Sequence, residues 1–316
     1  MVGTNGTTVA KFILVGLSDL PEVRFSLFLL LSIIYLATLA GNIIILIAVG
    51  TDIRLQNPMY FFLSNLSLLD ILCPTITVPK MLDMFLSENK EISFIGCMLQ
   101  LYFLIDVVGT EIFLLAVMAY DRYVAICYPL QYTTIMNKRL CAQMAAGTWI
   151  SGLLNSLLHT SFTFTLSFCG PNEVNQYFCD IPPVMALSCS STYTNEMVLL
   201  IEAGILGSSA FVITLVSYIY IAFAILRMSS TQSRQKAFST CTSHLTVVGL
   251  FYGTTIFTYV RPSSRYSPNQ DRVISMLYGI ITPMLNPMIY SLRNKEVKQA
   301  LMRVIHQERF TGRSQN

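Results

Sequence analysis

The sequence is poor in charged residues. Asp, Glu, Lys and Arg make up only 12% of its 316 residues, whereas hydrophobic residues make up 53%. Soluble domains carry about 25% charged residues, so this composition excludes an ordinary soluble domain and indicates a membrane protein. We attribute the formal net charge of +3 to membrane topology and expect no nucleic-acid partner.

Several chemical features are missing as well. The three histidines, His159, His244 and His306, lie in different segments without metal-ligand spacing, so we expect no catalytic metal, no other cofactor and no intramembrane enzyme. The chain beyond residue 292 has no cysteine, which excludes palmitoylation there. Residues 1–23 lack the apolar core of a signal peptide, so the first apolar segment is expected to direct membrane insertion without being cleaved.

Apolar runs long enough to cross a bilayer are abundant. A crossing helix needs about 20 residues, and hydropathy identifies seven such runs, at residues 25–49, 59–86, 94–127, 142–166, 197–226, 238–260 and 273–292. An odd number of crossings places the two termini on opposite sides. We therefore predict an all-α fold, a seven-transmembrane helix bundle embedded in a lipid bilayer.

The loops between these runs differ in basic residues. One side carries twelve and the other six. The positive-inside rule makes the richer side cytoplasmic, so we predict a multi-pass plasma-membrane protein with an extracellular amino terminus. The twelve are Arg54, Lys138, Arg139, Arg227, Arg234, Lys236, Arg293, Lys295, Lys298, Arg303, Arg309 and Arg313, and the six are Lys11, Arg24, Lys90, Arg261, Arg265 and Arg272.

This topology divides the chain into an extracellular amino terminus (1–24), a transmembrane domain (25–292) and a cytoplasmic tail (293–316). In the tail, Val297, Leu301, Val304 and Ile305 form an apolar stripe at helical spacing, which predicts a short amphipathic helix along the inner leaflet. Asn5 begins an Asn-Gly-Thr glycosylation triplet on the extracellular side. A second triplet, at Asn65, lies within an apolar run, out of reach of the glycosylating enzyme.

The most informative motif is MAYDRYVAIC at residues 118–127, where an acid and an arginine lie side by side at the end of an apolar run. An ionisable pair at this depth is costly unless it is used. The decapeptide resembles the inner end of the third transmembrane helix of olfactory receptors, a branch of the rhodopsin-like G-protein-coupled receptors. Further matches are Gly41-Asn42, PMYFFLSNLS at 58–67 followed by Asp70, Trp149, Ser217-Tyr218, KAFSTCTSHL at 236–245 and PMLNPMIY at 283–290.

The resemblance implies an odorant receptor that binds small molecules and activates a heterotrimeric stimulatory G protein of the olfactory type, raising cyclic AMP. In such receptors the arginine matching Arg122 is restrained at rest and reaches toward the G protein when the sixth span moves outward. Asp121 precedes it in the motif. Tyr218, His244 and Tyr290 match positions that contact this region, and we group these five residues as the expected switch.

Four polar residues fall deep in the apolar runs: Asn42, Asp70, Glu111 and Asn286. Unpaired, each would cost several kcal/mol in hydrocarbon, so they should converge through hydrogen bonds. Two readings stay open, a purely structural cluster and a rearrangeable relay that could hold a sodium ion near Asp70 and Glu111. No other metal site is expected.

Four cysteines, Cys97, Cys169, Cys179 and Cys189, lie on the extracellular side, where oxidising surroundings favour disulfides. Sequence alone leaves three pairings open. The resemblance implies Cys97 with Cys179, tying the second outer loop to the third span, and Cys169 with Cys189 within that loop.

The ligand site is expected between the outer halves of spans 3, 5, 6 and 7, because helical bundles build sites from facing side chains. Stripes of apolar residues at this spacing also arise from ordinary packing. The resemblance favours a pocket, whose branched aliphatic wall with two tyrosines and a threonine suits a small, mostly apolar volatile. The expected lining is Leu101, Leu104, Ile105, Val108, Gly109, Ile112, Glu202, Leu206, Tyr252, Thr255, Ile256, Tyr259 and Met276.

Two orientations are open for Glu202. It lies in the outer third of span 5 with no basic residue within one turn. On an ideal helix the 16 residues from Glu202 to Tyr218 place the two side chains roughly 160° apart, so both cannot face the bundle centre. Glu202 either lines the pocket, accepting a hydrogen bond or pairing with an amine, or faces span 4 or the headgroups in a structural role.

The alternative function is a membrane transporter or channel. Against it stand the odd number of spans, the absence of paired helix-interrupting segments in two halves, and the lack of a ring or file of charges along a path.

Overall fold

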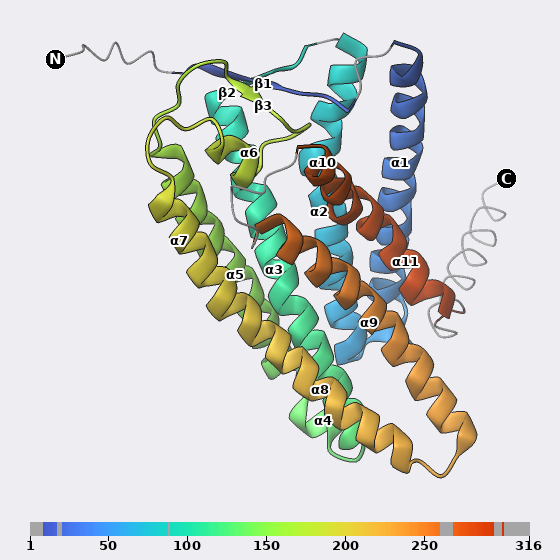
Figure 1. The fold of residues 1–316 in the computed structure, drawn as a ribbon. Helices are drawn as coiled ribbons and strands as arrows, with labels where there is room; N and C mark the ends of the chain where they lie inside the picture. The colour runs from blue at the N-terminus through green and yellow to red at the C-terminus, as the bar shows by residue number, and fades with distance from the viewer. Residues whose placement is uncertain (1–8, 18–20, 88, 260–267, 294–298, 300–316) are drawn as a thin grey trace, which may run out of the picture.

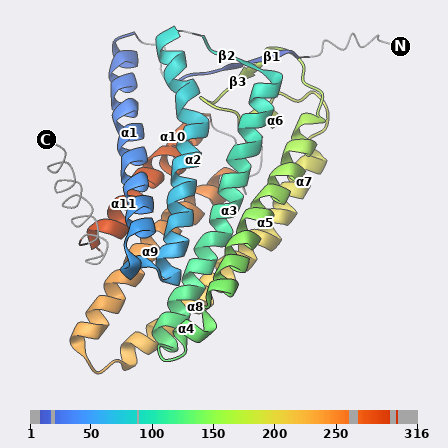
Figure 2. The same ribbon diagram turned by 180° about the vertical axis from the view of Figure 1, so that it is seen from behind.

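Among the described residues, the chain forms seven long helical segments, which lie side by side in a bundle (Figures 1 and 2). The computed structural model describes residues 9–17, 21–87, 89–259, 268–293 and 299. The predicted seven-helix bundle is confirmed, and π-helical turns interrupt its fifth and seventh segments. The segments are α1 (Pro21–Thr51), α2 (Pro58–Ser87), α3 (Phe94–Cys127), α5 (Lys138–Phe164), α7 (Tyr193–Glu202) continued by the turn Ala203–Gly207 and α8 (Ser208–Arg227), α9 (Thr231–Tyr259), and α10 (Pro268–Met276) continued by the turn Leu277–Ile281 and α11 (Thr282–Arg293).

Short helices occupy the connections: a 3-10 turn at Ile53–Leu55, α4 (Tyr132–Ile135) and α6 (Ile181–Met185). Side chains that accept backbone N–H groups mark where long helices begin. Ser93 Oγ accepts from Gly96 N at 3.0 Å before α3, and Asn137 Oδ1 accepts from Leu140 N at 2.9 Å before α5. Such caps satisfy backbone donors that have no partner within the helix.

The segments differ in how apolar they are. Within the described residues, five helical segments are both long and apolar enough to cross a membrane: Val23–Thr51, Pro58–Ser87, Phe94–Cys127, Tyr193–Arg227 and Asn269–Tyr290. Helices α5 and α9, with 27 and 29 residues, have sufficient length but are more polar. Their small and hydroxyl-bearing residues suit close packing against other helices, where such residues are enriched in membrane proteins.

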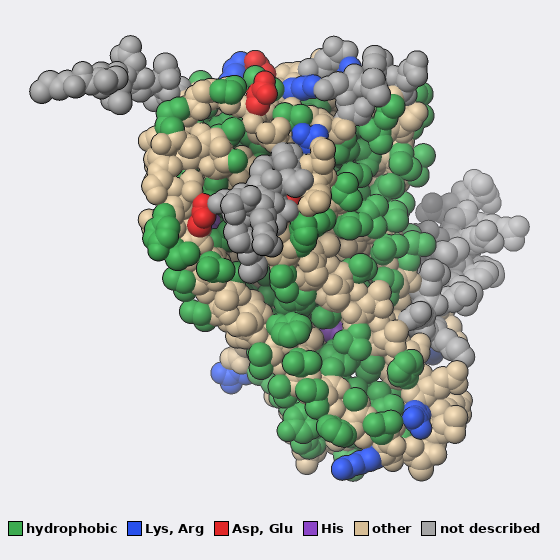
Figure 3. Space-filling view, in the orientation of Figure 1, with side chains coloured by type: hydrophobic (Ala, Val, Ile, Leu, Met, Phe, Trp, Pro, Cys, Tyr) green, Lys and Arg blue, Asp and Glu red, His purple; other side chains and the backbone are tan. Residues whose placement is uncertain are grey.

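The flanks of the bundle are apolar. Figure 3 shows hydrophobic side chains over much of the visible sides, with the visible Lys and Arg side chains toward the two ends. Phe25, Ile33 and Leu36 of α1 are 67%, 65% and 63% exposed. Exposure of such large side chains along whole helices is the pattern expected of a surface that faces lipid.

A small β-sheet, which the sequence analysis did not predict, covers the end of the bundle nearest the amino terminus (Figure 1). Its central strand is β1 (Lys11–Leu14), which pairs antiparallel with β2 (Glu91–Ser93) and parallel with β3 (Glu173–Val174). Side chains alternate along β1, and Phe12 and Leu14 are fully buried beneath the sheet. The Phe12 ring lies 5.9 Å from that of Phe94 and 5.5 Å from that of Phe168, centroid to centroid.

Both disulfide pairings implied by the resemblance are confirmed. Cys97 at the outer end of α3 bonds to Cys179, and Cys169 bonds to Cys189 within the second outer loop. Next to the first bridge, Gln100 Oε1 accepts a hydrogen bond from Cys179 N at 2.9 Å. The expected glycosylation residue Asn5 and the tail stripe of Val297, Leu301, Val304 and Ile305 lie outside the described residues, and the boundaries of the amino terminus and tail stay predictions.

Helices α3 and α5 approach closely at two buried glycines, Gly109 and Gly152. A Cβ built on Gly109 would lie 3.4 Å from Gly152 Cα, and one built on Gly152 would lie 2.6 Å from the Asp106 carbonyl oxygen and would collide with Thr110 Oγ1. A backbone oxygen cannot move aside without moving the helix. The crossing of these two helices therefore depends on the absence of a side chain at residue 152.

We predict that Gly152→Ala lowers surface expression and the melting temperature of the detergent-solubilised protein, with a loss of about 1–3 kcal/mol typical of an overpacked core. The control is Gly147→Ala on the same helix, where an added Cβ meets nothing within 4 Å. This control should be neutral or stabilising, because alanine favours the helix by up to about 1 kcal/mol over glycine. Equal behaviour of the two variants would contradict the steric explanation.

We also predict that Cys97→Ser and Cys179→Ser each prevent surface expression, because loss of a native disulfide costs about 2–5 kcal/mol. The double variant should be no worse than either single variant, since all three remove the same bond. Cys127→Ser removes a cysteine that forms no disulfide and is the control. Flow cytometry of tagged protein measures the effect, and additive losses in the double variant would point to separate roles for the two residues.

Candidate functional site

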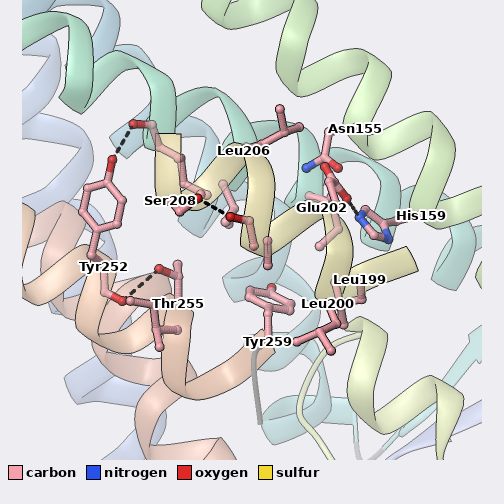
Figure 4. A pocket seen from close by; sticks show the side chains of 18 of the residues that line it. Asn155, His159, Leu199, Leu200, Glu202, Leu206, Ser208, Tyr252, Thr255 and Tyr259 are labelled. Carbon is pink, nitrogen blue, oxygen red and sulfur yellow. Dashed lines mark hydrogen bonds and ion pairs between the residues drawn. The ribbon is translucent and has the colours of Figure 1, made fainter. Parts of the chain in front are cut away.

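A cavity of about 340 Å³ lies between α3, α5, α9 and the α7–α8 segment. Figure 4 shows it from close by, with Glu202 on one wall and Tyr252, Thr255 and Tyr259 of α9 on the opposite side. Most of its wall is apolar, formed by residues such as Val108, Ile112 and Phe211. Its volume lies at the lower end of the range for small-molecule sites.

The structure places most of the predicted ligand residues on this wall, namely Ile105, Val108, Gly109, Ile112, Glu202, Leu206, Tyr252, Thr255, Ile256 and Tyr259. Three predicted residues do not line it. Leu101 is fully buried in the hydrophobic cluster that includes Phe12 and Leu14 of β1, Leu104 is buried in the main core, and Met276 packs against that core. The outer end of the α3 stripe is covered by a strand that the sequence analysis did not anticipate.

The cavity also differs from the prediction in the helices that form it. None of its lining residues comes from the described part of the seventh segment, and α5 supplies Asn155 and His159 instead. These two are four residues apart and so share one face of α5. The polar side chains Asn155, His159 and Glu202 form one wall of the cavity, and they come from span 4 (α5) and span 5 (the α7–α8 segment). We call this the polar wall.

The π-helical turn at Ala203–Gly207 corrects the geometric argument against Glu202. That argument assumed an unbroken α-helix between Glu202 and Tyr218. A turn with i→i+5 hydrogen bonds accommodates one extra residue and rotates one side of the helix by roughly 100° relative to the other, reducing the angle to roughly 60°. Both side chains can then face inward, and Glu202 does line the cavity.

Glu202 has two neighbours on α5. Its carboxyl group forms a short hydrogen bond with His159 Nε2, and the exposed fractions of the Glu202 and His159 side chains are 16% and 6%. The Asn155 amide, turned so that its nitrogen faces the carboxylate, donates to Glu202 Oε2 at 3.0 Å and also to Oε1. Glu202 thus faces span 4 and the cavity at once, which combines the two alternatives left open by the sequence.

Asp180, in the second outer loop, joins the loop to the helices beside the cavity. Its carboxylate accepts hydrogen bonds from Ile181 N at 2.8 Å, Tyr259 Oη at 3.0 Å and Tyr278 Oη at 3.1 Å. It is 1% exposed, and this burial raises its pKa to about 6 despite the three donors. Asp271 contributes repulsion in the same direction.

The expected polar relay is partly assembled. Asn286 Nδ2 donates to both Asp70 oxygens, at 2.9 and 3.1 Å, and Asn42 Nδ2 donates to the Pro283 carbonyl at 3.2 Å. Glu111 is buried within electrostatic range of Asp70, and its Oε1 has no hydrogen-bond partner among the described residues. Asn42 and Asn286 thus join α1 and α2 to α11, while Glu111 approaches Asp70 from α3.

The expected switch residues lie near one another at the carboxyl end of α3. Tyr218 Oη and His244 Nδ1 are 2.8 Å apart, joining α8 to α9, and Tyr132 Oη donates to Asp121 Oδ1 at 2.8 Å. The Arg122 charge acts on Tyr218, His244 and Tyr290. All five predicted switch residues are therefore in one region, and Tyr132 adds a contact that the sequence analysis missed.

Comparison with known proteins identifies the family. A family model described as "Olfactory receptor" matches residues 31–308. The chain belongs to the olfactory receptor family. It is 49% identical to mouse Olfactory receptor 5G25, over 98% of this chain and 97% of that protein, and 50% identical to human Olfactory receptor 10A7, over 98% of each chain. It is 48% identical to human Olfactory receptor 5A2, over 97% of this chain and 95% of that protein.

Family membership makes this olfactory receptor a multi-pass membrane protein of the G-protein-coupled class and gives no support to a transporter or channel. It also implies a small-molecule ligand and a G-protein partner. The polar wall residues Asn155 and His159 were nevertheless missed by sequence reasoning. The sequence did contain a signal. Asn155 and His159 are polar residues one turn apart in an apolar span, at a depth similar to that of Glu202, and this pattern could have predicted their contact with Glu202.

The pKa of Asp180 leads to a pH prediction. A pKa raised from about 3.9 in the unfolded chain to about 6 in the fold means that folding favours the protonated form. Its stabilising contribution is fully present below pH 4 and is lost as pH rises through 6. Acidification from pH 7.5 to 5 should therefore stabilise the wild-type olfactory receptor by roughly 1 kcal/mol relative to Asp180→Asn.

Melting temperatures of purified protein in detergent at the two pH values measure this difference. Glu173→Gln, which removes an exposed carboxylate from the same loop, is the control and should follow the wild-type pH dependence. If the difference in melting temperature between the wild type and Asp180→Asn is the same at pH 7.5 and at pH 5, Asp180 does not titrate in this range.

Proposed function

We propose that this receptor resides in the plasma membrane with its amino terminus outside, binds small, mostly apolar volatile molecules in the outer cavity, and activates a stimulatory olfactory-type G protein to raise cyclic AMP. The observation that carries the proposal is the apolar cavity of about 340 Å³ formed by helices that also carry the switch residues. About eleven water molecules, at ~30 Å³ each in the liquid, would fill that volume. A ligand of roughly ten non-hydrogen atoms matches it.

Helix α9 provides the physical connection between cavity and switch. Tyr252 lines the cavity and donates from Oη to the Ile112 carbonyl of α3 at 3.1 Å. His244 lies eight residues earlier on the same helix, roughly 12 Å along its axis, and contacts Tyr218. A ligand that binds one position of α9 more tightly than the other would shift the equilibrium at the cytoplasmic end.

The polar cluster around Asp70 fits a role in the same change. Buried Glu111 Oε1, Asn42 Oδ1 and Asn286 Oδ1 have no hydrogen-bond partner among the described residues, so the cluster has spare acceptors. A sodium ion would be held by Asp70 and Glu111 and would supply positive charge between two carboxylates. The chain's own hydrogen bonds, from Asn286 to Asp70 and from Asn42 to the α11 backbone, hold α1, α2 and α11 together in the arrangement seen.

The test is a functional screen. Cells expressing the receptor together with the olfactory stimulatory G protein are exposed to a chemically varied odorant panel, and cyclic AMP is recorded against cells without the receptor. Responses to some small apolar members are expected. Surface-expressed receptor that answers to no member in cyclic AMP, and that no member stabilises against heat, would contradict the proposed function.

We predict that Arg122→Ala abolishes the cyclic AMP response while leaving surface expression and ligand-induced thermal stabilisation largely intact, because Arg122 lies ten residues, about 15 Å, beyond the cavity residue Ile112. Arg54→Ala is the control, since Arg54 is an exposed arginine expected at the same membrane face. This variant should respond normally. A normal response of Arg122→Ala at matched surface expression would remove Arg122 from the switch.

A further inference from the structure

The hydroxyl groups that line the cavity already donate to protein acceptors. Tyr252 donates to the Ile112 carbonyl at 3.1 Å, Thr255 donates to the Phe251 carbonyl at 2.8 Å, and Tyr259 donates to Asp180. Ser208 donates to the Gly204 carbonyl within its own helix. Each of these hydroxyl groups can accept a hydrogen bond from a ligand, but its own proton is already used. The residues of α9 and Ser208 are therefore poor partners for a ligand that can only accept hydrogen bonds.

The polar wall, formed by α5 and the α7–α8 segment, is different. Among the described residues that line the cavity, Glu202 alone has a carboxyl group, and it lies on this wall. His159 and Asn155 approach this carboxylate from α5. The two oxygens of a carboxyl group carry about four lone-pair sites, so the contacts with His159 and Asn155 leave acceptor capacity for a ligand in the cavity that Glu202 lines. Figure 4 shows Glu202 between the two α5 residues, at the edge of the cavity.

The two α5 side chains also fix where the carboxylate lies. Asn155 and His159 are on the helix that packs closely against α3 at Gly152, so their backbone is well anchored. The π-helical turn begins at the residue after Glu202 and aims the glutamate inward. The Glu202 carboxyl group is thus a positioned acceptor in an apolar cavity, where a hydrogen bond is electrostatically stronger than in water.

From this geometry we propose that Glu202, positioned by His159 and Asn155, binds the hydrogen-bond donor head group of the ligand, so that the receptor's agonists are small alcohols or amines with a hydrocarbon body. The proposal rests on the function proposed above and specifies its ligand class. Ketones, ethers and esters lack the donor, as do carboxylic acids, which are ionised at neutral pH. The apolar wall around Val108, Ile112 and Phe211 contacts the body of the ligand.

The probes are sets of molecules of about ten non-hydrogen atoms that share a body and differ in the head group. One set is 1-nonanol, nonylamine, methyl octyl ether, nonanoic acid and decane, and equivalent sets use branched and cyclic bodies. Two readouts are recorded for each probe: cyclic AMP in cells, and thermal stabilisation of the purified receptor in detergent, which does not depend on the G protein.

In the wild-type receptor the alcohol and the amine of a set should act at concentrations at least tenfold lower than the ether, the acid and the hydrocarbon. Glu202→Gln keeps the size of the side chain and replaces one carboxyl oxygen by an amide nitrogen, which can only donate. It should weaken the alcohol and the amine by roughly 10- to 100-fold, the loss expected when a buried donor is left without its acceptor, with the larger loss for the amine. The ether and the hydrocarbon should change by less than about threefold.

Glu196→Gln is the matched control, because Glu196 carries the same charge on the same helix, accepts a hydrogen bond from Thr192 and does not line the cavity. It should leave the order of head groups unchanged. Equal shifts for all head groups in Glu202→Gln would overturn the proposal and return Glu202 to a structural role. The proposal would also be overturned if the wild-type receptor responded at the same concentration to an alcohol and to the ether of the same set. This comparison does not require any variant to fold.

The two proposals fail in different ways. A receptor that answers to the broad odorant panel but to no alcohol or amine would overturn the assignment of Glu202 and leave the proposed function standing. A receptor that answers to no odorant by either readout would contradict the proposed function itself.

Discussion

Polar side chains buried in hydrocarbon must find partners on other helices, and this constraint determines how the helices of the bundle are arranged. Asn42 reaches the α11 backbone, Asp70 binds Asn286, Tyr218 meets His244, and Glu202 meets His159. Apolar packing against lipid does not distinguish one rotation of a helix from another, because the lipid tails are as apolar as the side chains. A misrotated helix would leave these groups without partners, at a cost of several kcal/mol each.

The same constraint makes the two ends of the receptor chemically distinct. At the end that carries the sheet, polar contacts converge on one buried loop, where Cys179 is bonded to α3 and the neighbouring Asp180 is held by tyrosines of α9 and the seventh segment. At the opposite end, the contacts among the described residues include pairs of single side chains such as Tyr218 and His244. One end is fixed by a covalent bond, and the described contacts at the other end are reversible, which is consistent with movement there.

Much of this architecture could be predicted from the sequence because it depends on composition or on local motifs. The seven crossings follow from long apolar runs, and both disulfides follow from cysteines on the oxidising side together with the resemblance. The sheet could not be predicted, because β1 pairs with residues 91–93 and 173–174, which no local pattern connects to it. The inward direction of Glu202 could not be predicted either, because a π-helical turn in Ala203–Gly207 has no signature such as proline. Without that turn, His159 and Asn155 had no evident partner.

The neighbours of strand β1 in its sheet come from later and distant parts of the chain. β1 lies in the middle of its sheet, and Glu173, the first residue of its parallel partner, follows Leu14 by 159 residues (173 minus 14). During synthesis, Lys11–Leu14 is therefore made before either neighbour, and Phe12 and Leu14 have no core to enter until β2, α3 and the loop that carries β3 have followed. The sheet and the core beneath it can close only after the whole segment between β1 and β3 has been translated.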